Sequence, residues 1–445
     1  MIDIVIFIFV IALIVLLTAK YNVHAFITLV FVSIIFGIIY CLYTTYRLIP
    51  ELIVASITLG FGKTVARIGI IVVIGTILSV ILEKTGAATR IAIAVLKVVG
   101  RENLHIAMNL TGYITGIPIF CDSGFVILSP IARALSKLSK ASAVAVALAL
   151  ASGLYTTHAL VPPTPGPLIA AELLNANMAK VICLGLPVSL FSSLVGFWLS
   201  VKLAPRISIV EKSFPEELPD VEDLPPLIPS LLPLVTPIVL LILGTYSTVL
   251  PSSITNLGIA LSFLGSPLIA FTLALIMTIP LIKNMSIAEI NDMINRGIKI
   301  AAAIIVITGA GGALGNIMED SGIGYMLGSR LASLGLTGPL SLLMLFAIAA
   351  VLKIAQGSTT VALVTTPAIV SSMIPLLHVK PFLAVLAIAA GSMVVSHVND
   401  SYFWIVVGLT GMDVRSGYKS LTLITLVQGL VSIALIILMS EVLAY

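Results

Sequence analysis

Ionisable side chains inside long apolar runs are the residues of this sequence best suited to chemistry. Asp122 is the only charged residue within 103–132, and Asp400 ends another long uncharged run. His158 and His397 lie in similarly apolar surroundings. A carboxylate in lipid costs about 2.5 to 3.5 kcal/mol even on a gentle insertion scale, and an imidazole changes its charge near neutral pH. These two carboxylates and two imidazoles are therefore the candidates for carrying a proton.

Each candidate also has a structural interpretation. Asp122 could reach the membrane interface or cap the helix that starts after it. His158 could stay neutral and bridge two backbone groups instead of relaying protons. We nevertheless expect Asp122 to carry the proton, because glycine and proline on both sides give it open backbone; Asp400 is the rival carrier.

Helix-breaking residues interrupt the apolar runs at four places, 112–130, 157–167, 353–360 and 394–404. Open backbone at membrane depth is tolerated only against protein or water. The hydroxyls, amides and free helix N-termini at these places suit an organic anion. Helix packing explains any single hydroxyl better, but it does not explain such clusters. The predicted substrate-binding residues are Ser123, Thr157, Thr164, Gln356, Ser358, Thr359, Thr360, Ser396 and Asn399.

Membrane helices must position these residues. Of the 445 residues 59% are hydrophobic and only 9% are charged, whereas a soluble domain carries about 25% charged residues. The uncharged runs predict an all-α polytopic membrane protein with about 11 to 13 transmembrane segments of about 20 residues each. Membrane lipid is therefore an expected partner. Nucleic acid is not, because the basic residues form no block.

A weak internal repeat relates the two halves of the chain. ILEKTG at 81–86 matches IMEDSG at 317–322, a displacement of 236, and His158 falls on His397 at a displacement of 239. In secondary transporters such repeats are usually inverted across the membrane, and the substrate site lies where their interrupted helices meet near the midplane. We therefore expect two inverted structural repeats with broken or re-entrant helices.

The polar stretch EKSFPEELPDVED separates the two halves of the chain, because its prolines and carboxylates cannot enter lipid. The internal repeat then assigns one transport repeat to each half. The expected segments are N-terminal transmembrane helices at 1–62, a first transport repeat at 63–204, a polar cytoplasmic linker at 205–228, connecting transmembrane helices at 229–298 and a second transport repeat at 299–445. The positive-inside rule predicts that the basic residues of alternate loops lie on the same, cytoplasmic side of the membrane. These are Arg133, Lys137, Lys140, Lys202, Arg206, Lys212, Lys283, Arg296 and Lys299.

Several patterns argue against other chemistry. The three cysteines show no CxxC spacing, so neither a disulfide framework nor a metal site is expected. GFGKT at 60–64 lacks the first glycine of a phosphate loop. GAGGALG at 309–315 has no strand before it, and close helix approach explains it better than dinucleotide binding. No catalytic residue, metal or cofactor is predicted, and we expect a transporter and not an enzyme.

Five motifs taken together resemble the gluconate permease family of the ion transporter superfamily. They are GIPIFCDSGFVILSP, THALVPPTPGP, GAGGALGNIMEDSG, AQGSTTVALVTTP and SHVNDSYFW, and the likeness extends from about residue 60 to Gly429. The resemblance implies a permease of the prokaryotic cell membrane with about twelve spans that imports gluconate or a related sugar acid with protons. Two positions depart from the family pattern. Ser123 replaces the usual valine after the acidic residue, and Thr164 replaces a histidine in PPHPGP.

Elementary energetics agrees with proton coupling. Importing a monoanion against an interior 100 mV negative costs about 2.3 kcal/mol, which one co-transported proton cancels. The arginines lie at the ends of apolar runs or outside them, so Lys353 is the nearest cation available for a carboxylate.

Two alternatives remain open on the sequence. The first is another member of the same superfamily, a sodium-coupled or exchange transporter of a different organic acid. The second is a membrane-embedded enzyme that uses Asp122 or Asp400 with His158 or His397. The sequence leaves the oligomeric state open, a homo-oligomer included.

Overall fold

The computed structural model describes residues 2–45, 49–100, 103–139, 141–207, 223–247 and 255–443, and these ranges contain helices and no strand. Nine helices in them are long and apolar enough to cross a membrane, and a bent pair, Asn256–Leu264 with Pro267–Ile282, would make a tenth. The predicted all-α membrane fold is thus confirmed. Some predicted segments fold as shorter apolar helices, such as Pro381–Ser392 and Ser401–Thr410, because a break ends each one before it reaches the length of a bilayer span.

The helices follow one another with short connections. They are α1 (Ile2–Val15), α2 (Ala25–Thr45), α3 (Pro50–Lys84), α4 (Ala87–Val99), α5 (Leu104–Thr115), α6 (Cys121–Ser139), α7 (Ala143–Leu160), α8 (Pro165–Leu173), α9 (Met178–Leu203), α10 (Leu227–Tyr246), α11 (Thr255–Leu264), α12 (Pro267–Ile276), α13 (Ile279–Ile282), α14 (Ile287–Asp320), α15 (Ile323–Ser333), α16 (Pro339–Gln356), α17 (Thr359–Val370), α18 (Pro381–Ser392), α19 (Ser401–Thr410), α20 (Val414–Gly417) and α21 (Leu423–Leu443). Short π or 3-10 segments are η1 (Leu16–Lys20), η3 (Ala204–Arg206), η6 (Ser371–Leu376) and η7 (Tyr418–Thr422). Side-chain caps at Ser142, Asn177 and Ser286 explain where α7, α9 and α14 begin.

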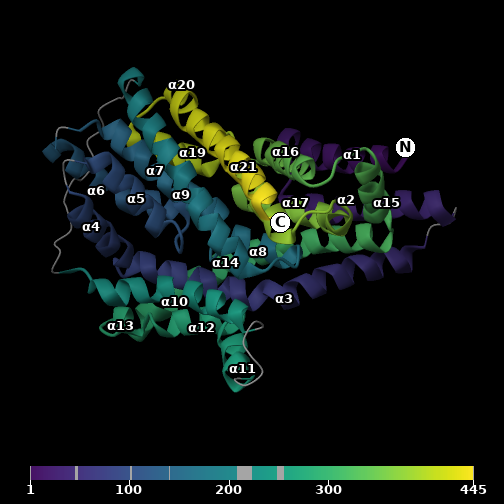
Figure 1. The fold of residues 1–445 in the computed structure, drawn as a ribbon, viewed down its shortest axis with the longest axis horizontal. Coiled ribbons are helices and arrows are strands. Elements are labelled where there is room, and N and C mark those ends of the chain that lie inside the picture. The colour runs from purple at the N-terminus through teal and green to yellow at the C-terminus, as the bar shows by residue number, and fades with distance from the viewer. Residues whose placement is uncertain are drawn as a thin grey trace.

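Helix α3 runs along most of the length of the molecule, with α10, α12 and α13 on one side of it and most of the remaining helices on the other (Figure 1). Helix α14 packs along α3 in the opposite direction. A Cβ added to Gly312 would lie 2.0 Å from Thr64 Oγ1, and one added to Gly297 would lie 2.7 Å from Ile77 Cα. The glycines of GAGGALG therefore allow close helix approach, as predicted.

The internal repeat extends from α3 to α9 and from α14 to α21. Seven helices of the first half recur in the second, and their first residues are 235 to 238 positions apart. The pairs are α3 with α14, α4 with α15, α5 with α16, α6 with α17, α7 with α18, α8 with α19, and α9 with the α20–α21 segment. Gly86 and Gly322, which end the matching hexapeptides, both have positive φ, of +76° and +71°. A residue without a Cβ is favoured at both corners for the same backbone reason.

The expected segment boundaries at 62 and 298 lie inside continuous helices, α3 and α14. We therefore propose that the repeats begin at Pro50 and Ile287, where these helices begin. Most of the expected linker, together with Lys140 and Lys212, lies outside the described residues.

Candidate functional site

All four predicted interruptions are open in the structure, at 116–120, 161–164, 357–358 and 393–400. They separate α5 from α6, α7 from α8, α16 from α17, and α18 from α19. Because these helices are paired by the repeat, the breaks form two repeat-related pairs. In the second break the prolines prevent α7 from continuing, and α8 begins only at Pro165.

The third and fourth breaks are held together by close backbone approach and side-chain caps. Gly357 has a φ of +79°, and a Cβ added to it would lie 2.0 Å from Asn399 O. Asn399 Nδ2 donates to Ile354 O at 2.7 Å, and His397 Nε2 lies 3.1 Å from the same carbonyl. This carbonyl is among the last of α16, where no intrahelical partner is available. His397 and Asn399 therefore cap α16.

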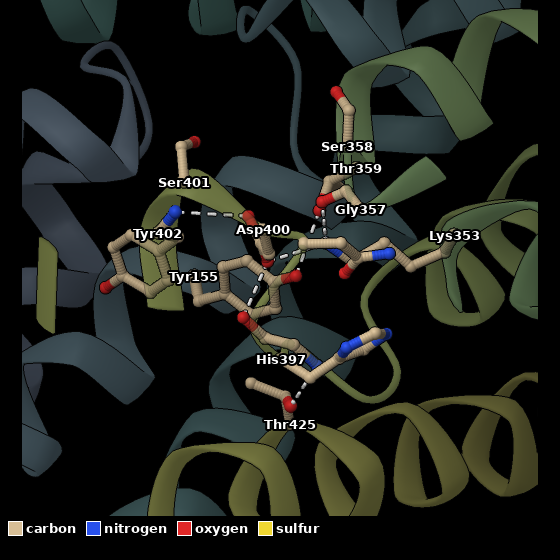
Figure 2. A network of polar contacts seen from close by, with 12 residues as sticks. Tyr155, Lys353, Gly357, Ser358, Thr359, His397, Asp400, Ser401, Tyr402 and Thr425 are labelled. Carbon is tan, nitrogen blue, oxygen red and sulfur yellow. Dashed lines mark hydrogen bonds and ion pairs between the residues drawn. The ribbon is translucent and has the colours of Figure 1, made fainter. Parts of the chain in front are cut away.

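A buried ion pair lies between these two breaks. Lys353 Nζ is 2.6 Å from Asp400 Oδ2, and the two side chains are 0% and 7% exposed. Lys353 Nζ also donates to Gly357 O at 2.6 Å and lies 5.9 Å from the centre of the Tyr155 ring. Figure 2 shows Asp400 at the centre of this network, with Lys353 on one side and Tyr402 on the other. Two opposite charges in so dry a position are tolerated because each also has hydrogen-bond partners.

Asp400 is the best-satisfied acid of the site. Its Oδ2 accepts a hydrogen bond from Ser396 Oγ at 2.6 Å, and its Oδ1 accepts one from Tyr402 N at 3.1 Å. The second contact makes Asp400 the N-cap of α19. The backbone of Ser396 is fixed in turn by Thr425, whose Oγ1 accepts from Ser396 N at 3.0 Å. Two hydrogen bonds and an ion pair therefore fix the position of this carboxyl.

Two stacked tyrosines connect the network to α7. The rings of Tyr155 and Tyr402 are 5.1 Å apart and inclined by 4°. Tyr155 OH lies 2.9 Å from Thr359 Oγ1, and Tyr402 OH donates to Ala151 O at 2.9 Å. The first turns of α17 and α19 are thus both attached to α7, a helix of the other repeat.

Asp122 belongs to the same site but is less satisfied. It lies in the first turn of α6, is half-buried, and accepts a hydrogen bond from the exposed Ser401 Oγ at 3.2 Å. Within the described residues it forms no ion pair. The capping position considered from the sequence is thus close to the observed one, because a carboxylate in the first turn of a helix is favoured by the helix dipole. Through Ser401, Asp122 is joined to the residue next to Asp400.

His158 lies in the last turn of α7 and Thr164 in the second break, and both side chains are buried. His158 is 5% exposed, its ring centre is 5.8 Å from that of Phe120, and its buried Nδ1 has no partner among the described residues. The structure therefore shows no bridge through Nδ1 between backbone groups. Thr164 Oγ1 lies 2.9 Å from His158 O and 2.7 Å from Val161 O, which closes the break internally.

The other predicted ligands differ in how free they are. Thr157 Oγ1 donates back to Gly153 O, and Ser358 Oγ caps α17 by accepting from Val361 N at 3.3 Å. Ser123, Gln356 and Thr360 are half-buried, and among the described residues no side-chain hydrogen bond involves them. The buried Oε1 of Gln356 has no hydrogen-bond partner in the part of the chain that the structure describes.

The sequence-based site did not include Lys353, Tyr155, Tyr402 or Ser401 as functional residues. For Lys353 a signal was present, because it is the only charged residue within 331–379. The argument applied to Asp122 selects it equally well. The tyrosines and Ser401 gave no comparable signal, because only the tertiary packing reveals their contacts: Tyr155 and Tyr402 join α7 to α17 and α19, and Ser401 joins α19 to α6.

Repeat-related broken helices that meet at a charged network, inside a bundle of membrane-length helices, define this molecule as a membrane transporter. Residues 2–442 match the GntP family permease, and the chain belongs to that family. A gluconate permease of Pseudomonas aeruginosa is 33% identical over 447 residues, which is 98% of this chain and 96% of the relative. This chain is thus a permease of the bacterial cell membrane, as predicted.

Two further comparisons define the range of its relatives. The D-serine transporter DsdX of Escherichia coli K12 is 31% identical over 434 residues and covers 95% of each chain. Among solved structures, Neisseria gonorrhoeae MtrF, described as one of a class of antimetabolite efflux pumps, has a TM-score of 0.70 at 16% identity and covers 95% of this chain and 96% of that one. The second likeness establishes the fold alone.

Proposed function

We propose that this permease imports gluconate or a related sugar acid by proton symport. The observation that carries the proposal is the polar network at the repeat-related breaks. Among the described residues it combines Asp122, which forms no ion pair, the buried pair of Lys353 and Asp400, and several hydrogen-bonding groups without a partner. Similarity over nearly the whole length to a gluconate permease supports the choice of substrate. We further propose that the two repeats have inverted orientations in the membrane.

The substrate would bind along the first turn of α17 and the adjacent start of α6. Ser123, Gln356 and Thr360 offer groups that the described residues leave unpaired. A sugar acid presents several hydroxyls, each of which can donate and accept, and such groups match an amide and two hydroxyls. Its carboxylate is suited to the free backbone N–H groups at the start of α17, beside Ser358.

Asp122 is the proposed proton carrier. Asp400 pairs with Lys353 and accepts hydrogen bonds from Ser396 and the Tyr402 N–H, so a proton on it would compete with an ion pair. The partners of Asp122 are neutral, Ser401 Oγ at 3.2 Å and the weak donor Cys121 Sγ at 4.0 Å, and its half-buried position favours the protonated form whenever the site is closed to water. When the site opens to the cytoplasm, hydration would favour release of that proton. His158, His397 and Asp400 remain secondary candidates.

The net charge that crosses the membrane in each transport step supports coupling to protons. One proton carried with a monoanion makes the step neutral and removes a cost of about 2.3 kcal/mol per 100 mV. A second proton would make uptake electrogenic. The ion pair of Lys353 and Asp400 is neutral as a unit, so it can stay inside the protein throughout.

The test is transport by purified protein in proteoliposomes. We expect uptake of gluconate in sodium-free buffer, driven by an inward proton gradient, abolished by a protonophore and accompanied by alkalinisation outside. The panel should contain other aldonic acids, uronic acids, dicarboxylic acids and D-serine. Uptake that requires sodium and survives the protonophore would indicate sodium coupling instead, and chemical conversion of the substrate without a second compartment would indicate an enzyme.

A further inference from the structure

A second polar region lies away from the four breaks, in a cleft of about 680 Å³. It is formed by α3 and α14 on one side and by the C-terminal ends of α8 and α17 with η6 on the other. This volume falls within the range of about 300 to 1,000 Å³ that is usual for small-molecule sites. We call it the outer cleft. Its principal polar lining residues are Lys63, Arg67, Glu172, Asn175, Asn316, Glu319 and Ser371.

Lys63 supplies the uncompensated positive charge of the outer cleft. Its side chain is exposed, and in the ranges that the structure describes it forms no ion pair or hydrogen bond. Arg67, one helical turn later, is already engaged by Glu172 at 3.4 Å and by Asn175 Oδ1 at 2.6 Å. An anion that enters the cleft would therefore meet Lys63 as a cation without a partner among the described residues, with the guanidinium of Arg67 already bound to Glu172 and Asn175.

Glu319 gives the outer cleft a selectivity for charge. It is exposed and lines the cleft from α14, and within the described residues it has no ion pair. One free ammonium and one free carboxylate attract a single negative charge but repel a second one. A monocarboxylate that bears hydroxyls fits this lining, because Ser371 provides a hydroxyl and Asn316 an amide oxygen that can accept, its Nδ2 being already bound to Ser56 and Asp320.

The charge distribution places the outer cleft on the face away from the cytoplasm. The positive-inside rule assigns Arg133 and Lys137 before α7, and Lys202 after it, to the cytoplasmic side. The stretch Ala143–Leu173 is long enough to cross the membrane. The turn at 174–177, which borders the outer cleft, therefore lies on the opposite side.

The outer cleft also leads toward the central network. Ala368, which lines it, and Thr359, which contacts Tyr155, lie on the same helix α17. The two residues are nine positions apart, which corresponds to about 13 Å of helix. A molecule in the cleft would therefore be about two and a half helical turns from the predicted substrate site.

We propose that the outer cleft is a separate binding site for a small hydroxylated monocarboxylate, occupied before the substrate reaches the central network. Lys63 holds its carboxylate, and Glu319 excludes dicarboxylates. This inference rests on the proposed import of an organic acid, but it adds a site that the four breaks do not contain.

The first test compares uptake kinetics of Lys63→Gln and Lys84→Gln. Both lysines are exposed on α3, but only Lys63 lines the outer cleft. At low ionic strength Lys63→Gln should raise KM for gluconate about three- to tenfold with little change in the maximal rate, because it removes an attractive charge. The difference should shrink as salt is added. Lys84→Gln should match the parent protein, and an unchanged KM in Lys63→Gln would overturn the proposal.

A second test detects binding without transport. In a chain carrying Cys41→Ser and Cys183→Ser, Ser371→Cys is labelled by a membrane-impermeant maleimide added to intact cells. We expect the maleimide to label Ser371→Cys from outside, and gluconate or another monocarboxylate of the panel to protect it. Adding Lys63→Gln should abolish this protection. Adding Glu319→Gln should allow D-glucarate to protect as well. Labelling only in inside-out vesicles, or no protection by any monocarboxylate, would overturn the site. If gluconate is not transported but another monocarboxylate protects, the outer cleft stands and the proposed substrate fails.

Discussion

Breaking the ion pair between Lys353 and Asp400 should destabilise the protein unequally, depending on which partner is removed. Removing one member of a buried pair costs about 3 to 5 kcal/mol, because it leaves the other charge without compensation. After Asp400→Asn, the fully buried Lys353 ammonium keeps Gly357 O as its strong acceptor, so we expect a loss in that range. The variant should also lose part of the connection between α16 and α19.

Replacing the lysine should cost less. After Lys353→Met, Asp400 still accepts from Ser396 Oγ and from Tyr402 N. Hydrogen bonds to a charged group contribute about 1.5 to 3 kcal/mol each, so these two contacts offset much of the desolvation of the carboxylate. We therefore expect a loss of about 1 to 3 kcal/mol for Lys353→Met, and we expect the double variant Lys353→Met, Asp400→Asn to be more stable than Asp400→Asn alone.

The assay is unfolding of purified protein by SDS titration, with helicity as the signal. Glu83 and Arg296 provide a matched control, because they form an ion pair at 3.0 Å between α3 and α14 that is partly exposed, with side chains 13% and 42% accessible. Removing either of them should cost about 0.2 to 1 kcal/mol. Equal losses for the two single variants of the buried pair, or a double variant as unstable as Asp400→Asn, would refute the reasoning.

Three further predictions concern the site. Asp122→Asn should abolish uphill accumulation of substrate while binding and exchange persist, since it removes titration but keeps shape; accumulation with normal pH dependence in vesicles would make Asp122 structural. Ser358→Ala and Asn399→Ala should each weaken substrate binding by about 0.5 to 1.5 kcal/mol, measured by calorimetry, and unchanged affinity in both would remove them from the site. Gly357→Ala should lower the thermal stability of the protein and its transport rate, because its Cβ would lie 2.0 Å from Asn399 O at a φ of +79°; a stable, active variant would contradict that close approach.

The sequence determined the elements of this protein but not their lateral arrangement. Uncharged runs fixed the membrane helices, because burying a charge in lipid is costly and an apolar run of sufficient length avoids that cost. Proline and glycine fixed the four breaks for an equally local reason, since Pro165 can begin α8 but cannot lie within a continuous α7. The repeat followed from the same local rules applied twice.

Tertiary structure alone decided which residues share a site. The sequence named Asp400 and Asp122 separately, 278 positions apart, and only the packing of α6 beside α19 brings Ser401 within 3.2 Å of Asp122. From the sequence, Lys353 was predicted only to be an available cation, whereas the structure shows that it is the buried partner of Asp400. Charge partners across helices cannot be predicted from composition or periodicity, because these describe each helix by itself, whereas the pairing depends on how helices distant in the chain pack together.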